Sequence, residues 1–431
     1  MTTPDAIVVG AGVMGASIAL ELARSGRSVV VLDKGDAVGG GSTSASSSVV
    51  RTNYSTLEGV TAAWEATHAW RAFPEHLGPV DGPIARLVTT GMMLIGPPGH
   101  DHSATTANFD RIGVPYEVVA AADMPTRFPL LDSGRFWPPR AAADPAFFDP
   151  ADGTVDVLWM PDGGFVDDPR LAATNMMDAA RREGAAVRLA TEVAEIVTEA
   201  GAVHSVRTTA GESIETACVV NAAGPWSAQV NRLVDGDPGL AVTTRALRQE
   251  VHSLKAPAGF TPDERGAAIA DLDLGTYFRP HFGGTIIVGG VEADCDPLVW
   301  LDDADDCDPS PTSEVFESHT YRVARRVPGA EVPLAPRGLA AAYDVTPDWV
   351  PIYDRTDIAG YYVAIGTSGN QFKNAPIVGG IMRTIVDACE SGRDHDESPV
   401  HYECRHTGLT LDLAHYSRRR DLNATSGTVL G

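Results

Sequence analysis

The chain has 431 residues, with 57 Asp or Glu against 33 Lys or Arg, so its formal net charge at pH 7 is −24. This acidity excludes a nucleic-acid binder, because contact with a phosphate backbone requires a basic face, and it disfavours binding to an anionic membrane. The acidity does not exclude an anionic small molecule as a ligand, because a local cationic pocket can oppose the negative electrostatic field of the whole protein. The length predicts two or three compact domains.

Cysteine usage indicates a reducing compartment. The five cysteines are scattered and form no C-x-x-C pair, so neither a disulfide framework nor a zinc ribbon is expected. Residues 6–20 are apolar, but no basic segment precedes them and three glycines interrupt them, so we expect no signal peptide and no membrane span. A cytoplasmic protein is the simplest prediction.

The first 33 residues contain a β-α-β unit. A short apolar run, 6–9, leads into Gly10-Ala-Gly12-Val-Met-Gly15, and a helical pattern to Arg24 precedes a second strand, 28–32, that ends at Asp33. In such a unit the first glycine permits the tight turn, the second lets the backbone approach a pyrophosphate, and the third lets helix pack on strand. The helix N-terminus offers N–H groups to the phosphates and Asp33 offers a carboxylate to ribose hydroxyls. A bound dinucleotide is therefore expected.

Further elements follow in chain order. By composition, residues 39–48 predict a flexible linker. A helix containing Trp64 and Trp70 is expected next, followed by a region of mixed strands and Pro-rich loops at 86–150. The later elements are helices at 170–183 and from Pro376 to about 391, and strands at 88–95, 187–196, 205–209, 218–221, 240–254, 267–269, 276–279, 285–289 and 361–365.

Three polar segments carry no site prediction. The acidic loop 301–308 lacks the Gly and terminal Glu of an EF-hand and is expected to be solvated. His401 to His406 contain ligand residue types in a spacing that fits no common metal site, so no metal is predicted. The tail from 392 onward is predicted to be a surface wrap or a disordered end.

Two glycine-containing turns favour FAD over NAD as the dinucleotide. Ala222-Ala-Gly224 follows a predicted strand, and Gly366-Thr-Ser-Gly369 precedes the last helix. Both return the chain to the first sheet, as expected where distant segments enclose a long cofactor. The second turn also feeds a helix start, whose N–H groups and dipole can stabilise negative charge on a reduced flavin.

In these and further segments the chain resembles the D-amino-acid-oxidase superfamily, in the branch of sarcosine oxidases, glycine oxidases and dimethylglycine dehydrogenases. The resemblance implies a fold of the α/β and α+β classes, with a Rossmann-type, glutathione-reductase-like FAD-binding domain interleaved with an antiparallel-sheet substrate domain. The segments that carry it are 7–33, 41–51, 164–169, 219–227, 277–280, 346–348 and 366–373.

The same resemblance gives domain boundaries. The FAD-binding domain is expected to be discontinuous, over 1–85, 155–230 and 335–395. The substrate domain is expected over 86–154 and 231–334, and 396–431 form a C-terminal tail.

The resemblance also implies site residues. Arg51 and Lys373 match positions that bind a substrate carboxylate in sarcosine oxidase relatives, as a guanidinium fork and a point charge. Lysine is informative here, because only three of the 33 basic residues are lysines. Tyr277 and His281 are further candidates for the catalytic pocket. The predicted cofactor-binding residues are Gly10, Gly12, Gly15, Asp33, Lys34, Ser42, Thr43, Val193, Ala223, Gly224, Gly366, Gly369, Asn370, Phe372 and Lys373.

Two departures from the relatives affect the flavin chemistry. Relatives that bind flavin through Cys have it where this chain has Ala341 or Ala342, and the loop 42–48, where others have His, contains none. Noncovalent FAD is therefore predicted. Monomeric sarcosine oxidase relatives carry a lysine on the strand matching 285–288, which has none here, so the absence of that cation puts direct oxidase activity in doubt. Arg279 and His281 are candidates for a substitute charge.

The predicted function is FAD-dependent oxidation of the C–N bond of a carboxylate-bearing amine, an N-methyl, cyclic or primary amino acid. Hydride transfer to flavin N5 would give an imine, which water hydrolyses. One alternative is oxidation of a 2-hydroxy acid, with a base such as His281 taking the hydroxyl proton. Another is a flavoprotein without turnover. The expected partners are the small-molecule amine and O2 or another electron acceptor, in a monomer or homodimer.

Overall fold

A six-stranded sheet surrounds the first strand of the chain. The computed structural model describes residues 3–430, and the strand order of this sheet is β20-β21-β13-β1-β2-β9. Neighbouring strands are parallel, except for the antiparallel pair β20 and β21. Its strands are β1 (Ala6–Val9), β2 (Val29–Leu32), β9 (Ala186–Arg188), β13 (Val219–Asn221), β20 (Ile352–Arg355) and β21 (Tyr361–Ile365).

Both faces of this sheet are covered. Alternate residues such as Ala6 and Val8 face the helices, while Ile7 and Val9 face a small three-stranded sheet. The glycine-rich turn and the two inner strands therefore form the predicted dinucleotide fold. The covering elements are α1 (Val13–Arg24), α6 (Pro169–Arg182) and α9 (Ala375–Glu390) on one face, and β10 (Val193–Glu199), β11 (Ala202–Thr208) and β12 (Ser213–Glu215) on the other.

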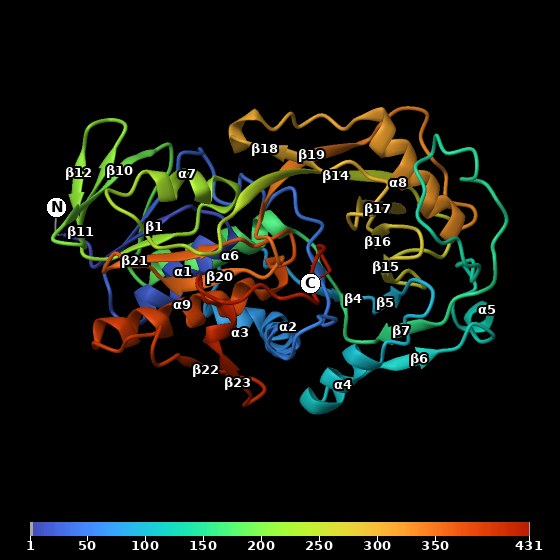
Figure 1. The fold of residues 1–431 in the computed structure, drawn as a ribbon, viewed down its shortest axis with the longest axis horizontal. Helices are drawn as coiled ribbons and strands as arrows, with labels where there is room; N and C mark the ends of the chain where they lie inside the picture. Colours follow the sequence, from blue (N-terminus) through green and yellow to red (C-terminus); the bar gives the residue numbers. More distant parts are fainter. Residues whose placement is uncertain (1–2, 431) are drawn as a thin grey trace.

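A nine-stranded sheet forms the other half of the molecule (Figure 1). It is antiparallel apart from one parallel pair, β5 with β15. Helix α8 (Ser313–Arg326) packs on it, and β14 runs along the top of the view from one half to the other. Its strands are β5 (Met92–Ile95), β6 (Glu117–Val119), β7 (Val157–Met160), β14 (Arg245–Lys255), β15 (Ala268–Asp271), β16 (Thr276–His281), β17 (Thr285–Gly290), β18 (Val299–Leu301) and β19 (Gly338–Val345).

Shorter elements connect the two halves. A small sheet places β3 (Val49–Val50) and β4 (Leu87–Thr89) on either side of β8 (Gly164–Val166). The remaining helices are α2 (Leu57–Arg71), α3 (Phe73–Leu77), α4 (Ser103–Ile112), α5 (Met124–Arg127) and α7 (Ser227–Arg232), with 3-10 turns η1 (Gly224–Trp226), η2 (Ala304–Asp306) and η3 (Phe372–Asn374). No helix in the described range 3–430 is long and apolar enough to cross a membrane.

Four local predictions differ from the structure. The single strand expected at 187–196 is two strands, β9 and β10, which belong to different sheets. The single strand expected at 88–95 is two strands, because Gly91 breaks it at φ 74°, where a Cβ would lie 1.9 Å from the Trp159 ring. The strand expected from Leu240 begins at Arg245. The flexible linker expected at 39–48 is a packed series of turns: Ser48 Oγ donates to the Val166 carbonyl at 2.6 Å.

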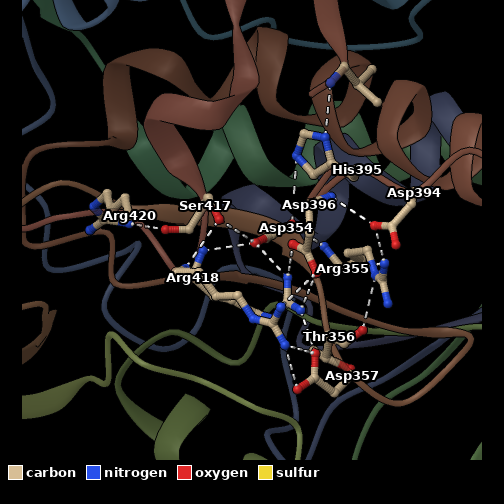
Figure 2. A network of polar contacts seen from close by, with 12 residues as sticks. Asp354, Arg355, Thr356, Asp357, Asp394, His395, Asp396, Ser417, Arg418 and Arg420 are labelled. Atoms are coloured by element: carbon tan, nitrogen blue, oxygen red, sulfur yellow. Dashed lines mark hydrogen bonds and ion pairs between the residues drawn. The ribbon is translucent and has the colours of Figure 1, made fainter. Parts of the chain in front are cut away.

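Of the two alternatives predicted for the C-terminal tail, a surface wrap or a disordered end, the disordered end is wrong. The segment after α9 forms β22 (His401–Glu403), β23 (Thr410–Asp412) and the 3-10 turn η4 (Leu413–Tyr416). Arg418 is fully buried, and its guanidinium contacts Asp354 and Asp396 (Figure 2). A run of three arginines suggests a solvated end in the sequence, but two of them, Arg418 and Arg420, pair with buried carboxylates.

Candidate active site

The turn after β1 brings the start of α1 against the neighbouring strands. Gly10 has φ 112°, and a Cβ there would lie 2.5 Å from the carbonyl oxygen of Ala222. A Cβ on Gly15 would lie 1.9 Å from the Gly10 carbonyl oxygen, so the helix packs directly on the turn. Asp33 accepts a hydrogen bond from the Ala11 N–H at 2.6 Å. Only glycines permit these close approaches.

A large cavity of about 390 Å³ opens beside this turn. It has the size of a site for a substantial organic ligand. A Cβ on Gly12 would point toward Thr43 Oγ1 at 3.3 Å, so glycine keeps the space open there. The predicted cofactor residues that line the cavity are Gly10, Gly12, Asp33, Lys34, Ser42, Thr43, Val193, Ala223, Gly224, Gly369 and Phe372.

The residues of this cavity fit FAD. The N-terminus of α1 provides the positive end of a helix dipole for the pyrophosphate, and Asp33 lies at the end of β2 for the ribose hydroxyls. Segments far apart in sequence close the cavity, as a long cofactor requires. Four predicted cofactor residues are placed differently: Gly15 and Gly366 pack within the scaffold, while Asn370 and Lys373 line a second cavity.

The acidic loop 301–308 reaches the rim of the large cavity, although it was expected to be only a solvated loop. Asp305 forms an ion pair with Lys34 at 2.6 Å and accepts a hydrogen bond from Trp226 Nε1 at 2.7 Å. Lys34 Nζ also lies 4.7 Å from the centre of the Trp226 ring. Lys34 therefore anchors this loop at the cavity. Within residues 3–430, no group of three or more His, Cys, Asp or Glu could hold a metal ion.

The second cavity, of about 40 Å³, adjoins the first. Ser46, Ser47 and Tyr343 line both cavities, so a ligand in one would lie next to a ligand in the other. The structure brings together in its wall three of the four predicted catalytic residues, which are Arg51, Lys373 and Tyr277.

Arg51 and Lys373 are buried cations without a buried anion. Their exposed fractions are 4% and 2%, and in the described part of the chain no carboxylate lies within 4.0 Å of either side chain. Arg51 instead donates to the carbonyls of Asn53 and Val429, the latter at 2.7 Å, and Lys373 donates to the Asn370 carbonyl.

The electrostatics of these two cations favour an anionic ligand. Both lie over the ring of Tyr54, at 4.5 Å for the guanidinium carbon of Arg51 and 4.9 Å for Lys373 Nζ. Burial lowers the pKa of both groups, and the charge of Arg51 lowers the pKa of Lys373 further. Because buried charges are costly unless paired, a carboxylate in this cavity would satisfy both residues at once.

Two tyrosines form the opposite wall. The pKa of Tyr277 and that of Tyr343 are both raised, chiefly because both side chains are buried. Glycines make room for the rings: a Cβ on Gly289 would lie 2.6 Å from Tyr277, and one on Gly369 would lie 2.3 Å from Tyr343. Glycines therefore leave room for both rings, and of the two only Tyr343 lines both cavities.

The fourth predicted catalytic residue, His281, lies apart from the residues that line either cavity. Its Nδ1 is 3.1 Å from Arg279 Nη1, and burial together with the Arg279 charge lowers its pKa. Arg279 is buried, donates from Nε to the Ser47 carbonyl at 2.7 Å, and has its pKa lowered to about 10 by burial. Through Ser47 it supports the loop shared by the two cavities.

Sequence reasoning missed three residues of the site: Tyr54, Glu292 and Val429. Tyr54 donates from its hydroxyl to the Asn370 carbonyl at 2.8 Å and so fixes the loop before Lys373. Its position three residues after Arg51 was the one available signal. Glu292 and Val429 reach the site only through tertiary contacts, and no local pattern marks them.

The chain is similar to known proteins along most of its length. The chain matches the FAD dependent oxidoreductase (DAO) family over residues 5–384. It is 24% identical to a glycine oxidase of Geobacillus kaustophilus, covering 90% of this chain and 94% of the relative. It is 26% identical to the mitochondrial sarcosine dehydrogenase of Homo sapiens, over 59% of this chain but only 25% of that longer protein.

Solved structures show the same fold. An L-proline dehydrogenase from P. horikoshii superposes with a TM-score of 0.75 at 22% identity, covering 97% of each chain. A glycine oxidase from Geobacillus kaustophilus superposes with a TM-score of 0.74 at 20% identity, covering 97% of this chain and 99% of the other.

Proposed function

The chain belongs to the family of FAD-dependent oxidoreductases, and we propose that it oxidises the C–N bond of an amine that also bears a carboxylate. One observation carries the proposal: Arg51 and Lys373, buried and without an anionic partner, line a small cavity directly beside the cavity that fits FAD. Glycine, sarcosine and proline, which appear in the names of the relatives, are amino acids that carry a carboxylate.

The residues of the small cavity orient the substrate. Arg51 offers a planar fork and Lys373 a point charge, so the carboxylate is fixed at that end. Tyr277 and Tyr343 enclose the rest of the substrate and exclude water from it. FAD, when bound, accepts the hydride from the carbon next to nitrogen. The resulting imine hydrolyses in water, and O2 or another electron acceptor would complete the reaction.

We propose that FAD is held without a covalent bond. Ala341 and Ala342 line the large cavity where relatives with tethered flavin have cysteine, and neither can form that bond. The serine-rich loop 42–48 contains no histidine. The five cysteines are all free, which supports a cytoplasmic location.

Oxidation of an amine is favoured over oxidation of a 2-hydroxy acid. A hydroxy acid requires a base for its hydroxyl proton, and the candidate base, His281, lies outside the lining of both cavities. An amine that binds in its neutral form requires no such base.

The test combines a substrate panel with one substitution. Under anaerobic conditions, N-methyl, cyclic and primary amino acids and 2-hydroxy acids are mixed with the holoenzyme, and bleaching of the visible flavin band is followed. An amine class should bleach it. Lys373→Met should then raise KM for that amine about ten- to hundred-fold, the range for losing a hydrogen bond to a charged group.

The matched control is Lys255→Met, which removes an exposed lysine paired with Glu331. Its KM should equal that of the wild type. An unchanged KM in Lys373→Met contradicts the carboxylate assignment. Bleaching by hydroxy acids alone contradicts amine oxidation, and no bleaching at all favours a flavoprotein without turnover.

A further inference from the structure

One residue of the C-terminal tail is held at both ends: by Arg51, which lines the small cavity, and by Glu292, which lies outside the lining of both cavities but contacts Val429. Val429 donates its backbone N–H to Glu292 Oε2 at 2.8 Å and accepts at its own carbonyl oxygen from Arg51 Nη2 at 2.7 Å. Val429 lines the same cavity as Arg51 and Lys373. The tail therefore contacts the cation proposed to bind the substrate.

The Val429 atoms that are held in this way are bonded to one another in the same order as in a free amino acid. Within Val429, N, Cα, C and O follow one another as they do in any α-amino acid. The peptide N–H stands for the substrate amine, and the peptide carbonyl oxygen stands for one carboxylate oxygen. Glu292 and Arg51 are thus spaced to hold the two ends of one α-amino acid.

The groups at the two ends of Val429 have the polarity that such a ligand needs, with an acid beside the N–H and a cation beside the carbonyl oxygen. In the described range no cationic side chain lies within 4.0 Å of the Glu292 carboxylate, which accepts from Val429 and from Gln249 Nε2 at 3.1 Å. The cations at the other end lack an acid. Burial and the nearby charge of Asp296 raise the pKa of Glu292 to about 8, as expected for an acid without a counter-charge.

The backbone at Glu292 is also unusual. It lies two residues after β17 with φ 55°, in the left-handed region that non-glycine residues rarely adopt. The Val429 side chain belongs to an apolar cluster with Tyr277, Val291 and Trp349, so the third substituent of Cα meets apolar surface.

We propose, building on the function above, that Glu292 recognises the substrate amine while Arg51 and Lys373 hold the carboxylate, and that Val429 occupies this site until substrate displaces it. The substrate is then an α-amino acid with an apolar side chain. The tail residues 427–430 act as a replaceable strap over the pocket.

The test measures equilibrium binding to the holoenzyme with two matched probes. 2-Aminoisobutyrate has an amine and a carboxylate but no hydrogen on Cα, so it cannot lose hydride. Isobutyrate has the same carbon skeleton and no amine. Glu292→Gln keeps the shape of the side chain and removes its carboxyl group. Dissociation constants are measured by calorimetry and by the shift of the flavin spectrum.

Glu292→Gln should raise the dissociation constant of 2-aminoisobutyrate about ten- to hundred-fold and leave that of isobutyrate within about two-fold. Equal changes for both probes, or none for either, overturn the assignment of Glu292 while the carboxylate site stands. If the wild type binds neither probe, the carboxylate site itself is refuted and the inference fails with it.

A second variant tests the strap without touching Glu292. A chain that stops after Ser426 should bind 2-aminoisobutyrate several-fold more tightly, because no internal competitor remains. Weaker binding would show that Val429 is part of the site rather than its occupant, and would overturn that part of the proposal.

Discussion

Arg418 is the residue whose loss should most affect the stability of the tail. It is fully buried and its guanidinium contacts Asp354 at 3.1 Å and Asp396 at 2.7 Å (Figure 2). Asp354 is itself fully buried on β20. Replacing Arg418 by Met removes the charge and leaves that carboxylate without its main cation. Breaking a buried pair in this way costs about 3 to 5 kcal/mol.

This loss in the free energy of unfolding can be expressed as a change in melting temperature. The unfolding entropy of globular proteins is about 2.1 cal/mol/K per residue near 60 °C. For 431 residues unfolding together this is about 0.9 kcal/mol/K. A loss of about 4 kcal/mol in the free energy of unfolding therefore lowers Tm by about 4 °C.

The neighbouring arginine supplies the control. Arg419 also pairs with Asp357, at 2.7 Å, but half of its side chain is exposed. Exposed pairs contribute about 0 to 1 kcal/mol, so Arg419→Met should lower Tm by about 1 °C at most. Both variants are compared with the wild type by scanning calorimetry of the holoenzyme. Equal shifts for the two variants would refute the reasoning, because they would show that burial of Arg418 does not determine its contribution.

Two further predictions concern the cofactor. Gly10→Ala should weaken FAD retention at least ten-fold on gel filtration, because its Cβ would lie 2.5 Å from the Ala222 carbonyl oxygen. Gly26 also has a positive φ, 90°, but a Cβ there would meet nothing within 4 Å, so Gly26→Ala should retain FAD normally. Equal losses of FAD in the two variants would mean that backbone strain alone is responsible. Acid precipitation of the holoenzyme should release yellow FAD into the supernatant, and a yellow pellet would contradict noncovalent binding.

The dinucleotide fold could be predicted because its signal is local. The turn requires Gly10 and Gly15 for steric reasons that act within one strand-turn-helix unit, so the sequence alone indicates it. Arg51 and Lys373 could also be assigned, since each belongs to a short segment that resembles a known family. Their burial without an anion became visible only in the structure.

The rest of the site depends on contacts between distant segments. Glu292 and Val429 are 137 positions apart and are joined by one hydrogen bond, which no periodic pattern in the sequence predicts. The pairing of Asp305 with Lys34 could not be predicted either, because Asp305 lies in an acidic run of the kind that is usually solvated. Nor could the pairing of Arg418, because its partners lie on other elements. Charge runs in a sequence do not reveal which member is buried. The domain boundaries stay a prediction.

The anchoring of the tail determines how the proposed strap can move. After Arg418, the chain is held again at Asp348, which pairs with Arg420 at 2.8 Å and accepts from the Asn423 N–H at 3.2 Å. The residues beyond this anchor, 424–430, can extend by up to about 3.5 Å each, which is enough to withdraw Val429 without breaking the Arg418 contacts.

Opening the strap and unfolding the anchor are therefore separate events with separate costs. Displacing Val429 breaks two hydrogen bonds, each with a net contribution of about 1 kcal/mol, or somewhat more at charged partners. Breaking the buried Arg418 pairs costs more than either of them. Because the anchor keeps the strap attached, Val429 competes at an effective concentration of about millimolar, as short flexible links provide. A substrate whose amine contacts Glu292 and whose carboxylate contacts Arg51 and Lys373 can displace it, whereas a carboxylate without an amine gains only one of the two contacts.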